Sequence, residues 1–114
     1  MNIVNEQIEI LNKLSQLMYD SAEDGFDEIG CVFKYDYGYK DGSSSVGTKY
    51  WNIVNGEKIY KRLSDNFTCI ELIPQLHKIM KAHTGGEWTE FTLTINKDGK
   101  ANTKFKYPDQ ETIT

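Results

Sequence analysis

In the first part of the chain, apolar residues recur with the period of an amphipathic helix. Between Ile3 and Met18 they occupy positions 3, 4, 8, 10, 11, 14, 17 and 18. A stripe this broad is typical of a helix that buries one face against a core. The polar cluster that follows, together with Gly25, supplies a stop signal. We therefore expect a helix over residues 3–18.

The next segment changes to a period of two, which is typical of a β-strand with one buried face. Over residues 27–39 the inward positions are Ile29, Cys31, Phe33, Tyr35, Tyr37 and Tyr39. A flexible loop of glycine and serine is expected over residues 40–47. Residues 48–54 predict a second strand, and Asn55-Gly56 marks a tight turn into residues 58–60, a candidate short third strand.

A second helix is expected over residues 69–83. Thr68 is the predicted N-cap, and Glu71, three residues later, would complete a capping box. Pro74 cannot donate to the helical ladder, so either the helix bends there or it begins near Ile73. The residues expected on its buried face are Leu72, Leu76, Ile79, Met80 and His83.

The end of the chain predicts a hairpin, with strands over residues 87–96 and 101–107 joined at Asp98-Gly99. The element order is α-β-β-(β)-α-β-β. Antiparallel strands interrupted by helices predict an α+β fold, in which one antiparallel sheet of about four to five strands carries both helices on one face. The absence of a linker or repeat predicts a single domain over residues 1–114.

Composition narrows the classes of function. The chain has 114 residues, a net charge of -4 and a single arginine, Arg62, which disfavours nucleic acids and anionic membranes as partners. Cys31 and Cys69 lie in apolar runs and are expected to be buried free thiols. The first residues lack the continuous apolar stretch of a secretion signal, and no run is long enough to span a bilayer. A cytoplasmic location is therefore expected.

No residue pattern predicts a catalytic, cofactor-binding or metal-binding site, and no cofactor is expected. His77 and His83 are six positions apart, which places them on different sides of a helix rather than around one metal ion. Residues 42–49 have the glycine spacing of a phosphate loop. However, Thr48-Lys49 stands where such a loop has lysine followed by serine or threonine, and a strand is expected to follow instead of a helix. A flexible loop is the expected structure there.

Charge is distributed unevenly. Residues 1–41 contain nine acidic and three basic side chains, a local net charge of -6, whereas the rest of the chain carries +2. A solvated helix-to-strand connection would explain this pattern. The alternative is a surface that binds a basic protein, because acidic groups steer such a partner and tyrosines add rigid contact area. Its candidate residues are Asp20, Glu23, Asp24, Asp27, Glu28, Tyr35, Asp36, Tyr37, Tyr39 and Asp41.

The last third of the chain carries a distinctive pattern: Glu-Trp-Thr-Glu-Phe-Thr-Leu-Thr-Ile-Asn at residues 87–96, Asp-Gly-Lys at 98–100 and Lys-Phe-Lys-Tyr at 104–107. Together with the element order and the tyrosine-rich first strand, this ending resembles the YezG-like immunity proteins. The resemblance implies a small bacterial antitoxin that neutralises a nuclease toxin delivered between cells. It brings no catalytic motif, and its pattern positions are expected to be scaffold: Trp88, Leu93, Gly99, Phe105 and Tyr107. An immunity protein against a contact-dependent growth inhibition toxin would have a similar architecture.

These observations lead to one functional hypothesis and its alternatives. The chain would bind a cognate toxin domain with a basic nuclease cleft and inhibit it by occlusion. The interface could instead lie on the open face of the sheet, with Thr92, Thr94, Lys104 and Lys106. A different class of function would be a ligand-binding or enzymatic domain, with a pocket between sheet and helices lined by Tyr50, Trp51 and the strand tyrosines. An interaction subunit of an unrelated assembly is a third reading.

Overall fold

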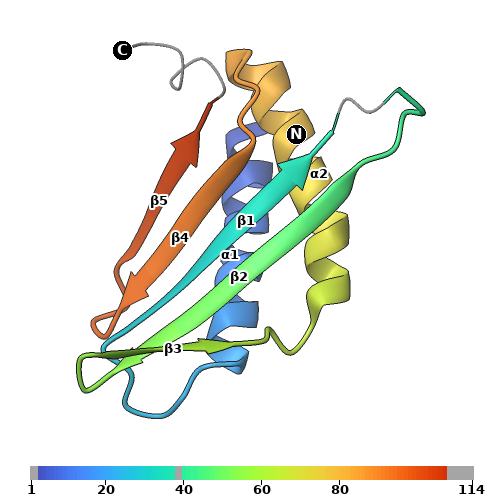
Figure 1. Cartoon of the computed structure of the whole chain (residues 1–114). Coiled ribbons are helices and arrows are strands. Elements are labelled where there is room, and N and C mark those ends of the chain that lie inside the picture. Colours follow the sequence, from blue (N-terminus) through green and yellow to red (C-terminus); the bar gives the residue numbers. More distant parts are fainter. Residues whose placement is uncertain (1–2, 38–39, 108–114) are drawn as a thin grey trace, which may run out of the picture.

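The computed structural model describes residues 3–37 and 40–107, which form a two-layer α+β structure. In chain order the elements are α1 (Ile3–Asp20), β1 (Glu28–Asp36), β2 (Ser45–Val54), β3 (Glu57–Lys61), α2 (Asn66–Thr84), β4 (Glu90–Asn96) and β5 (Ala101–Lys106). Figure 1 shows both helices on one face of the sheet, while the opposite face is uncovered. The predicted fold class and element order, including the short third strand, are confirmed.

The sheet has the order β3-β2-β1-β4-β5, with every neighbouring pair antiparallel. The first strand of the sequence is therefore the central strand of the sheet. In the register, Cys31 on β1 lies between Tyr50 on β2 and Leu93 on β4. Because side chains alternate between the two faces of a strand, this register decides which residues face the helices and which face outward.

The core lies between the sheet and the helices. From the sheet it receives Ile29, Cys31, Phe33, Tyr50, Phe91, Leu93 and Ile95, and from the helices Ile10, Leu14, Met18, Ile73 and Leu76, among others. Cys31 and Cys69 are buried free thiols, as predicted. Burial raises the pKa of both thiols, that of Cys69 to about 11. Neither thiol therefore has the thiolate character of a reactive cysteine.

The start of the second helix differs from the prediction. The helix begins at Asn66, and its N-cap is Asp65 rather than Thr68. One Asp65 oxygen accepts a hydrogen bond from the Thr68 backbone N–H at 3.1 Å, and the other accepts one from the Thr68 hydroxyl at 2.5 Å. The predicted capping box of Thr68 and Glu71 is therefore wrong, because a carboxylate three residues earlier already satisfies the free N–H group.

Other boundaries shift as well. The helix runs through Pro74 and ends at Thr84. Its C-cap is Gly85, whose φ of 76° is left-handed and whose N–H donates to the Lys81 carbonyl. The first helix extends to Asp20, beyond the predicted end at residue 18. β2 begins at Ser45 and so includes the end of the predicted loop over residues 40–47. Since a strand follows the glycine-rich segment, the rejection of a phosphate loop is confirmed.

Candidate functional site

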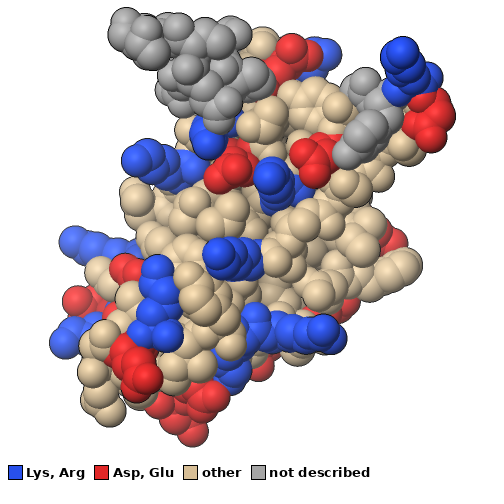
Figure 2. Space-filling view, in the orientation of Figure 1, with Lys and Arg blue, Asp and Glu red and all other residues tan. Residues whose placement is uncertain are grey.

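Five of the predicted acidic residues lie on the connection between α1 and β1 or at the two element ends that flank it, at one end of the sheet. Asp20 ends α1, and Glu28 begins β1. Asp27 ties this connection to the β2–β3 hairpin, because its N–H donates to the Ile53 carbonyl at 2.7 Å and its carboxylate accepts from the Gly56 N–H at 3.3 Å. Figure 2 shows acidic side chains along this lower rim of the molecule, with lysines among them. The fold thus keeps these acids together.

The five acids differ in how free their side chains are. Glu23 forms an ion pair with Lys61 at 2.5 Å, and its backbone N–H donates to the buried Asn52 side chain at 2.7 Å. Asp20 accepts a hydrogen bond from Gln16, one helical turn earlier, and Asp24 is exposed. Glu23 and Asp27 therefore help to hold the connection in place. Within the described residues, the exposed side chains of Asp20 and Asp24 form no hydrogen bond or ion pair with the sheet.

The rest of the predicted site lies at the other end of β1. Glu28 and Asp36 are eight residues apart on one strand, which corresponds to about 26 Å. Asp36 and Asp41 are exposed, and the pKa of Asp41 is lowered by hydrogen bonds from the Ser43 hydroxyl and N–H. Tyr39 lies outside the described residues. The structure therefore divides the predicted site into two groups instead of one continuous patch.

Tyr35 and Tyr37 turn toward α2 and pack in an aromatic cluster. Their rings lie 5.0 and 4.5 Å from the His77 ring, and His77 lies 5.0 Å from the buried Trp88. The Tyr37 hydroxyl donates to the Glu87 carbonyl at 3.1 Å. Both tyrosines are half-buried, so they contribute more to packing between β1 and α2 than to exposed contact area.

His77 is the residue whose role sequence reasoning missed. The expected buried histidine was His83, but His83 is exposed and His77 is buried. Burial lowers the pKa of His77, with the nearby Lys81 acting in the same direction and Glu87 opposing it. Within the described part of the chain, its Nε2 atom has no hydrogen-bond partner, and neither has the Trp88 Nε1 atom. The sequence did contain a signal for the burial of His77: it lies four residues after Ile73 and three before Met80, the spacing of residues on one helix face, and both neighbours are buried.

The open face of the sheet carries a second aromatic group. Trp51 covers Gly30 on β1, where an added Cβ would lie only 2.3 Å from the indole ring. The Tyr60 ring lies edge-on at 6.4 Å from Trp51, and the Lys58 ammonium lies 4.6 Å from the indole centroid. Tyr50, which precedes Trp51 on β2, faces the helices, and its hydroxyl donates a hydrogen bond to the Met18 carbonyl at 2.6 Å. Tyr50 and Trp51 therefore cannot line one pocket, and the proposed aromatic pocket between sheet and helices is wrong in this respect.

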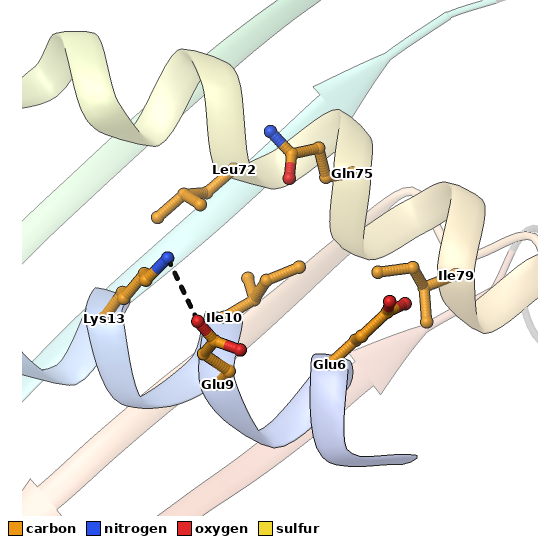
Figure 3. A pocket seen from close by; sticks show the side chains of 7 residues that line it. All are labelled: Glu6, Glu9, Ile10, Lys13, Leu72, Gln75 and Ile79. Carbon is orange, nitrogen blue, oxygen red and sulfur yellow. Dashed lines mark ion pairs between the residues drawn. The ribbon is translucent and has the colours of Figure 1, made fainter. Parts of the chain in front are cut away.

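Hollows of the described surface lie on the open face of the sheet and between the helices. One, of about 400 Å³, lies on the open face and is lined by Val32, Lys34, Gly47, Thr48, Lys49 and Glu90. Another, of about 240 Å³, lies between the helices, with Glu6, Glu9, Ile10 and Lys13 from α1 and Leu72, Gln75 and Ile79 from α2. Figure 3 shows these two rows facing each other, with the ion pair of Lys13 and Glu9 at the rim. Both hollows are shallow surface features rather than enclosed active-site cavities.

Among the described residues, no group of three or more histidine, cysteine, aspartate or glutamate side chains could hold a metal ion. Within the same part of the chain, neither helix combines the length and the apolar character that a membrane span requires.

Comparison with known proteins identifies the family. The sequence model of the YezG-like immunity proteins matches residues 19–113. The chain belongs to this family. Membership supports a role as an immunity protein. The residues that carried the resemblance lie in the matched region, where Trp88 and Leu93 are buried and Gly99 has a φ of 83° in the β4–β5 turn.

A curated relative of this YezG-like protein is the Chorionicgonadotropic hormone-like protein of Stenotrophomonas maltophilia. The two sequences are 29% identical over 79 residues, which is 68% of this chain and 18% of the relative. The chain thus spans less than a fifth of that protein's length.

Proposed function

We propose that this YezG-like immunity protein binds a nuclease toxin domain and covers its active site or its substrate-binding surface. The observation that supports this proposal is the gathering of five carboxylates, from residues 20–28, at one end of the sheet. Nucleases bind phosphate through positively charged clefts, and an inhibitor of such a cleft benefits from carboxylates placed against it.

In this proposal, Asp20, Asp24 and Glu28 face the basic cleft, while Glu23 and Asp27 hold the connection that carries them. Asp36, Asp41 and the edge of the tyrosine cluster form a second contact region at the other end of β1. A standard interface covers about 800 Å² on each partner, a patch roughly 28 Å across. One toxin domain that lies along β1 could therefore contact both regions.

The proposal includes the cellular location and the mode of inhibition. The protein acts as one domain over residues 1–114 in the cytoplasm of the producing cell, where it neutralises toxin delivered by neighbouring cells, as in contact-dependent growth inhibition. It inhibits without catalysis and without a cofactor.

Co-expression with the toxin encoded beside the immunity gene tests the proposal. We expect cells that produce both proteins to survive, and the two proteins to purify as a complex. Purified toxin should cleave RNA or DNA, and added immunity protein should inhibit that cleavage by competing with the nucleic acid. Growth arrest despite co-expression, together with no complex, would reject the assignment. If excess nucleic acid does not relieve the inhibition, the mechanism of cleft occlusion is rejected, but the role as an immunity protein is not.

A further inference from the structure

The open face of the sheet has a charge opposite to that of the whole chain. According to the strand register, five lysines face away from the helices: Lys34, Lys49, Lys58, Lys104 and Lys106. Three carboxylates share this face, those of Glu28, Asp36 and Glu90. The face is therefore net positive on a chain whose net charge is -4. Figure 2 shows this face directly, with lysine side chains spread over it among uncharged residues and a few acidic ones.

Gly47 opens a hollow beside two of these lysines. It lies opposite Lys34 in the register, and its φ is not among the positive values, so its backbone conformation does not require glycine. A Cβ at this position would meet only the Lys34 Cβ, at 3.8 Å. The missing side chain contributes to the hollow of about 400 Å³, in which Val32 supplies an apolar surface between Lys34 and Lys49.

The two lysines of the hollow are available to a partner. Neither forms an ion pair with a carboxylate within the described ranges. Glu90 lies at the rim and is the one carboxylate that lines the hollow. Lys49 also lies 5.0 Å from the Tyr60 ring centroid, so it connects the hollow to the aromatic pair of Trp51 and Tyr60. Tyr60 is 56% exposed and offers a flat contact surface with a polar tip.

We propose that the open face binds an acidic segment of a protein partner. A carboxylate of the segment pairs with Lys34 and Lys49, and a neighbouring apolar side chain enters the hollow against Val32. An extended segment suits this face because alternate side chains of a strand point in one direction. One row of its side chains can therefore contact the hollow, and Lys49 connects the hollow to Tyr60. Phosphate groups would also attract lysines. However, the hollow combines its two lysines with the apolar Val32, which an apolar side chain of a peptide can contact and a phosphate backbone cannot, so a protein segment is favoured over a nucleic acid.

The hollow with Lys34 and Lys49 is separate from the acidic end proposed to face the toxin cleft, although Glu28 and Asp36, at the two ends of β1, belong both to the proposed toxin contact and to the open face. The hollow selects a partner group of opposite charge. The inference goes beyond the proposed function, because it concerns a second kind of partner group, bound at these two lysines. Its test uses a peptide rather than the toxin, so its outcome is independent of toxin neutralisation.

The experiment is an NMR titration of the ¹⁵N-labelled full chain, at low ionic strength. The probe is a blocked eight-residue peptide of alternating glutamate and leucine. We expect shifts of the backbone amides of residues 32–34 and 47–49 and of the Trp51 indole N–H. The double variant Lys34→Glu/Lys49→Glu should weaken binding at least about tenfold, as expected when two charge-assisted contacts become repulsive. Gly47→Leu, which fills the hollow and leaves the charges unchanged, should also weaken binding.

The matched control is Lys13→Glu/Lys78→Glu, which changes the net charge equally but lies on the helices. It should bind the peptide like the parent chain. An equal loss in this control would overturn the proposal, because general charge would then explain binding. Shifts that map to the helices would also overturn it. Tighter binding of an eight-nucleotide oligothymidine to the same amides would replace the acidic segment with a nucleic acid.

Discussion

At the residue scale, Gly30 shows how a missing side chain shapes the central strand. Trp51 lies over Gly30, and an added Cβ would come within 2.3 Å of the indole ring. We expect Gly30→Ala to displace the indole and to lower the free energy of unfolding by about 1–3 kcal/mol, the range for overpacked sites. Urea denaturation followed by far-UV circular dichroism measures this change.

Gly47→Ala is the matched control, because its Cβ would meet only the Lys34 Cβ at 3.8 Å. Its free energy of unfolding should stay within about 0.5 kcal/mol of the parent value. If Gly30→Ala changed the free energy of unfolding as little as Gly47→Ala, the indole would have room to move, and the packing of Trp51 would not require glycine at position 30.

His77 should make stability depend on pH. Burial lowers the folded-state pKa of its imidazole below the ordinary value of 6.5, although Glu87 opposes the shift. The unfolded chain therefore binds this proton more readily, and folding stability falls as pH drops from about 6.5 through the lower folded pKa. We expect His77→Gln to reduce the pH dependence of the urea midpoint between pH 7.5 and 5.

The exposed His83 provides the control for this experiment. His83→Gln should keep the parent chain's dependence on pH. The groups that face His77 include Tyr35 and Tyr37 from the sheet side and Lys81 and Glu87 beyond it. An unchanged slope in His77→Gln would assign the effect to another of these groups.

The candidate site was only partly predictable from the sequence, for a physical reason. The count of acids over residues 20–28 located one charged end of the molecule, because neighbours in sequence remain neighbours in a short connection. The link of Glu23 to Lys61 and the aromatic contacts of His77 join residues far apart in the chain. No local pattern encodes such contacts, so the division of the predicted residues into two groups needed the fold.

At the scale of elements, the start of α2 depends on Asp65. Its carboxylate accepts hydrogen bonds from both the N–H and the hydroxyl of Thr68, which also lower its pKa below 3.8. We expect Asp65→Ala to lower the urea midpoint, because the helix loses its N-cap. Asp65→Asn should retain most of the stability, since its amide oxygen can still cap the helix.

The pH dependence gives a second readout of the same cap. Because the folded-state pKa of Asp65 is depressed, its contribution is present above about pH 3.8 and is lost as pH falls through the folded value. The difference between the parent chain and Asp65→Ala should therefore narrow in acid. A difference that persisted at the lowest pH would show that the charge of the carboxylate has no part in the cap.

Strand alternation predicted the sheet better than capping signals predicted α2. Ile29, Cys31 and Phe33 face the core, as do Phe91, Leu93 and Ile95, because a period of two leaves one face to bury. At the helix, the prediction took Thr68 as the N-cap, whereas the Asp65 carboxylate, three residues earlier, caps the helix and accepts hydrogen bonds from Thr68 itself. The alternative start near Ile73, raised because of Pro74, is wrong: the helix begins at Asn66, continues to Thr84 and packs Ile73 and Leu76 in the core.

At the scale of the whole molecule, the structure separates charges that the composition adds together. The net charge of -4 combines an acidic end at residues 20–28 with an open sheet face on which lysines predominate. A partner that contacts the acidic end is attracted by carboxylates, and one that contacts the open face is attracted by ammonium groups. Variants on one region should therefore leave the association at the other almost unchanged.

The acidic end can be tested without disturbing the fold, because Asp20 and Asp24 are exposed and make no contact with the sheet in the described structure. We expect Asp20→Lys/Asp24→Lys to slow association with the toxin at least about tenfold at low ionic strength, because electrostatic steering acts mainly on the on-rate. The difference from the parent chain should shrink as salt is added, since exposed charges are screened beyond about 8 Å at physiological ionic strength.

The matched control is Glu6→Lys/Glu71→Lys, which makes the same change in net charge on the helices. Stopped-flow or surface plasmon resonance measures the rates, and the urea midpoint of each variant verifies the fold. If the acidic end steers the toxin, Asp20→Lys/Asp24→Lys slows association far more than the control does. Equal slowing would show that total charge attracts the toxin, and an unchanged on-rate in both would move the first contact away from the acidic end.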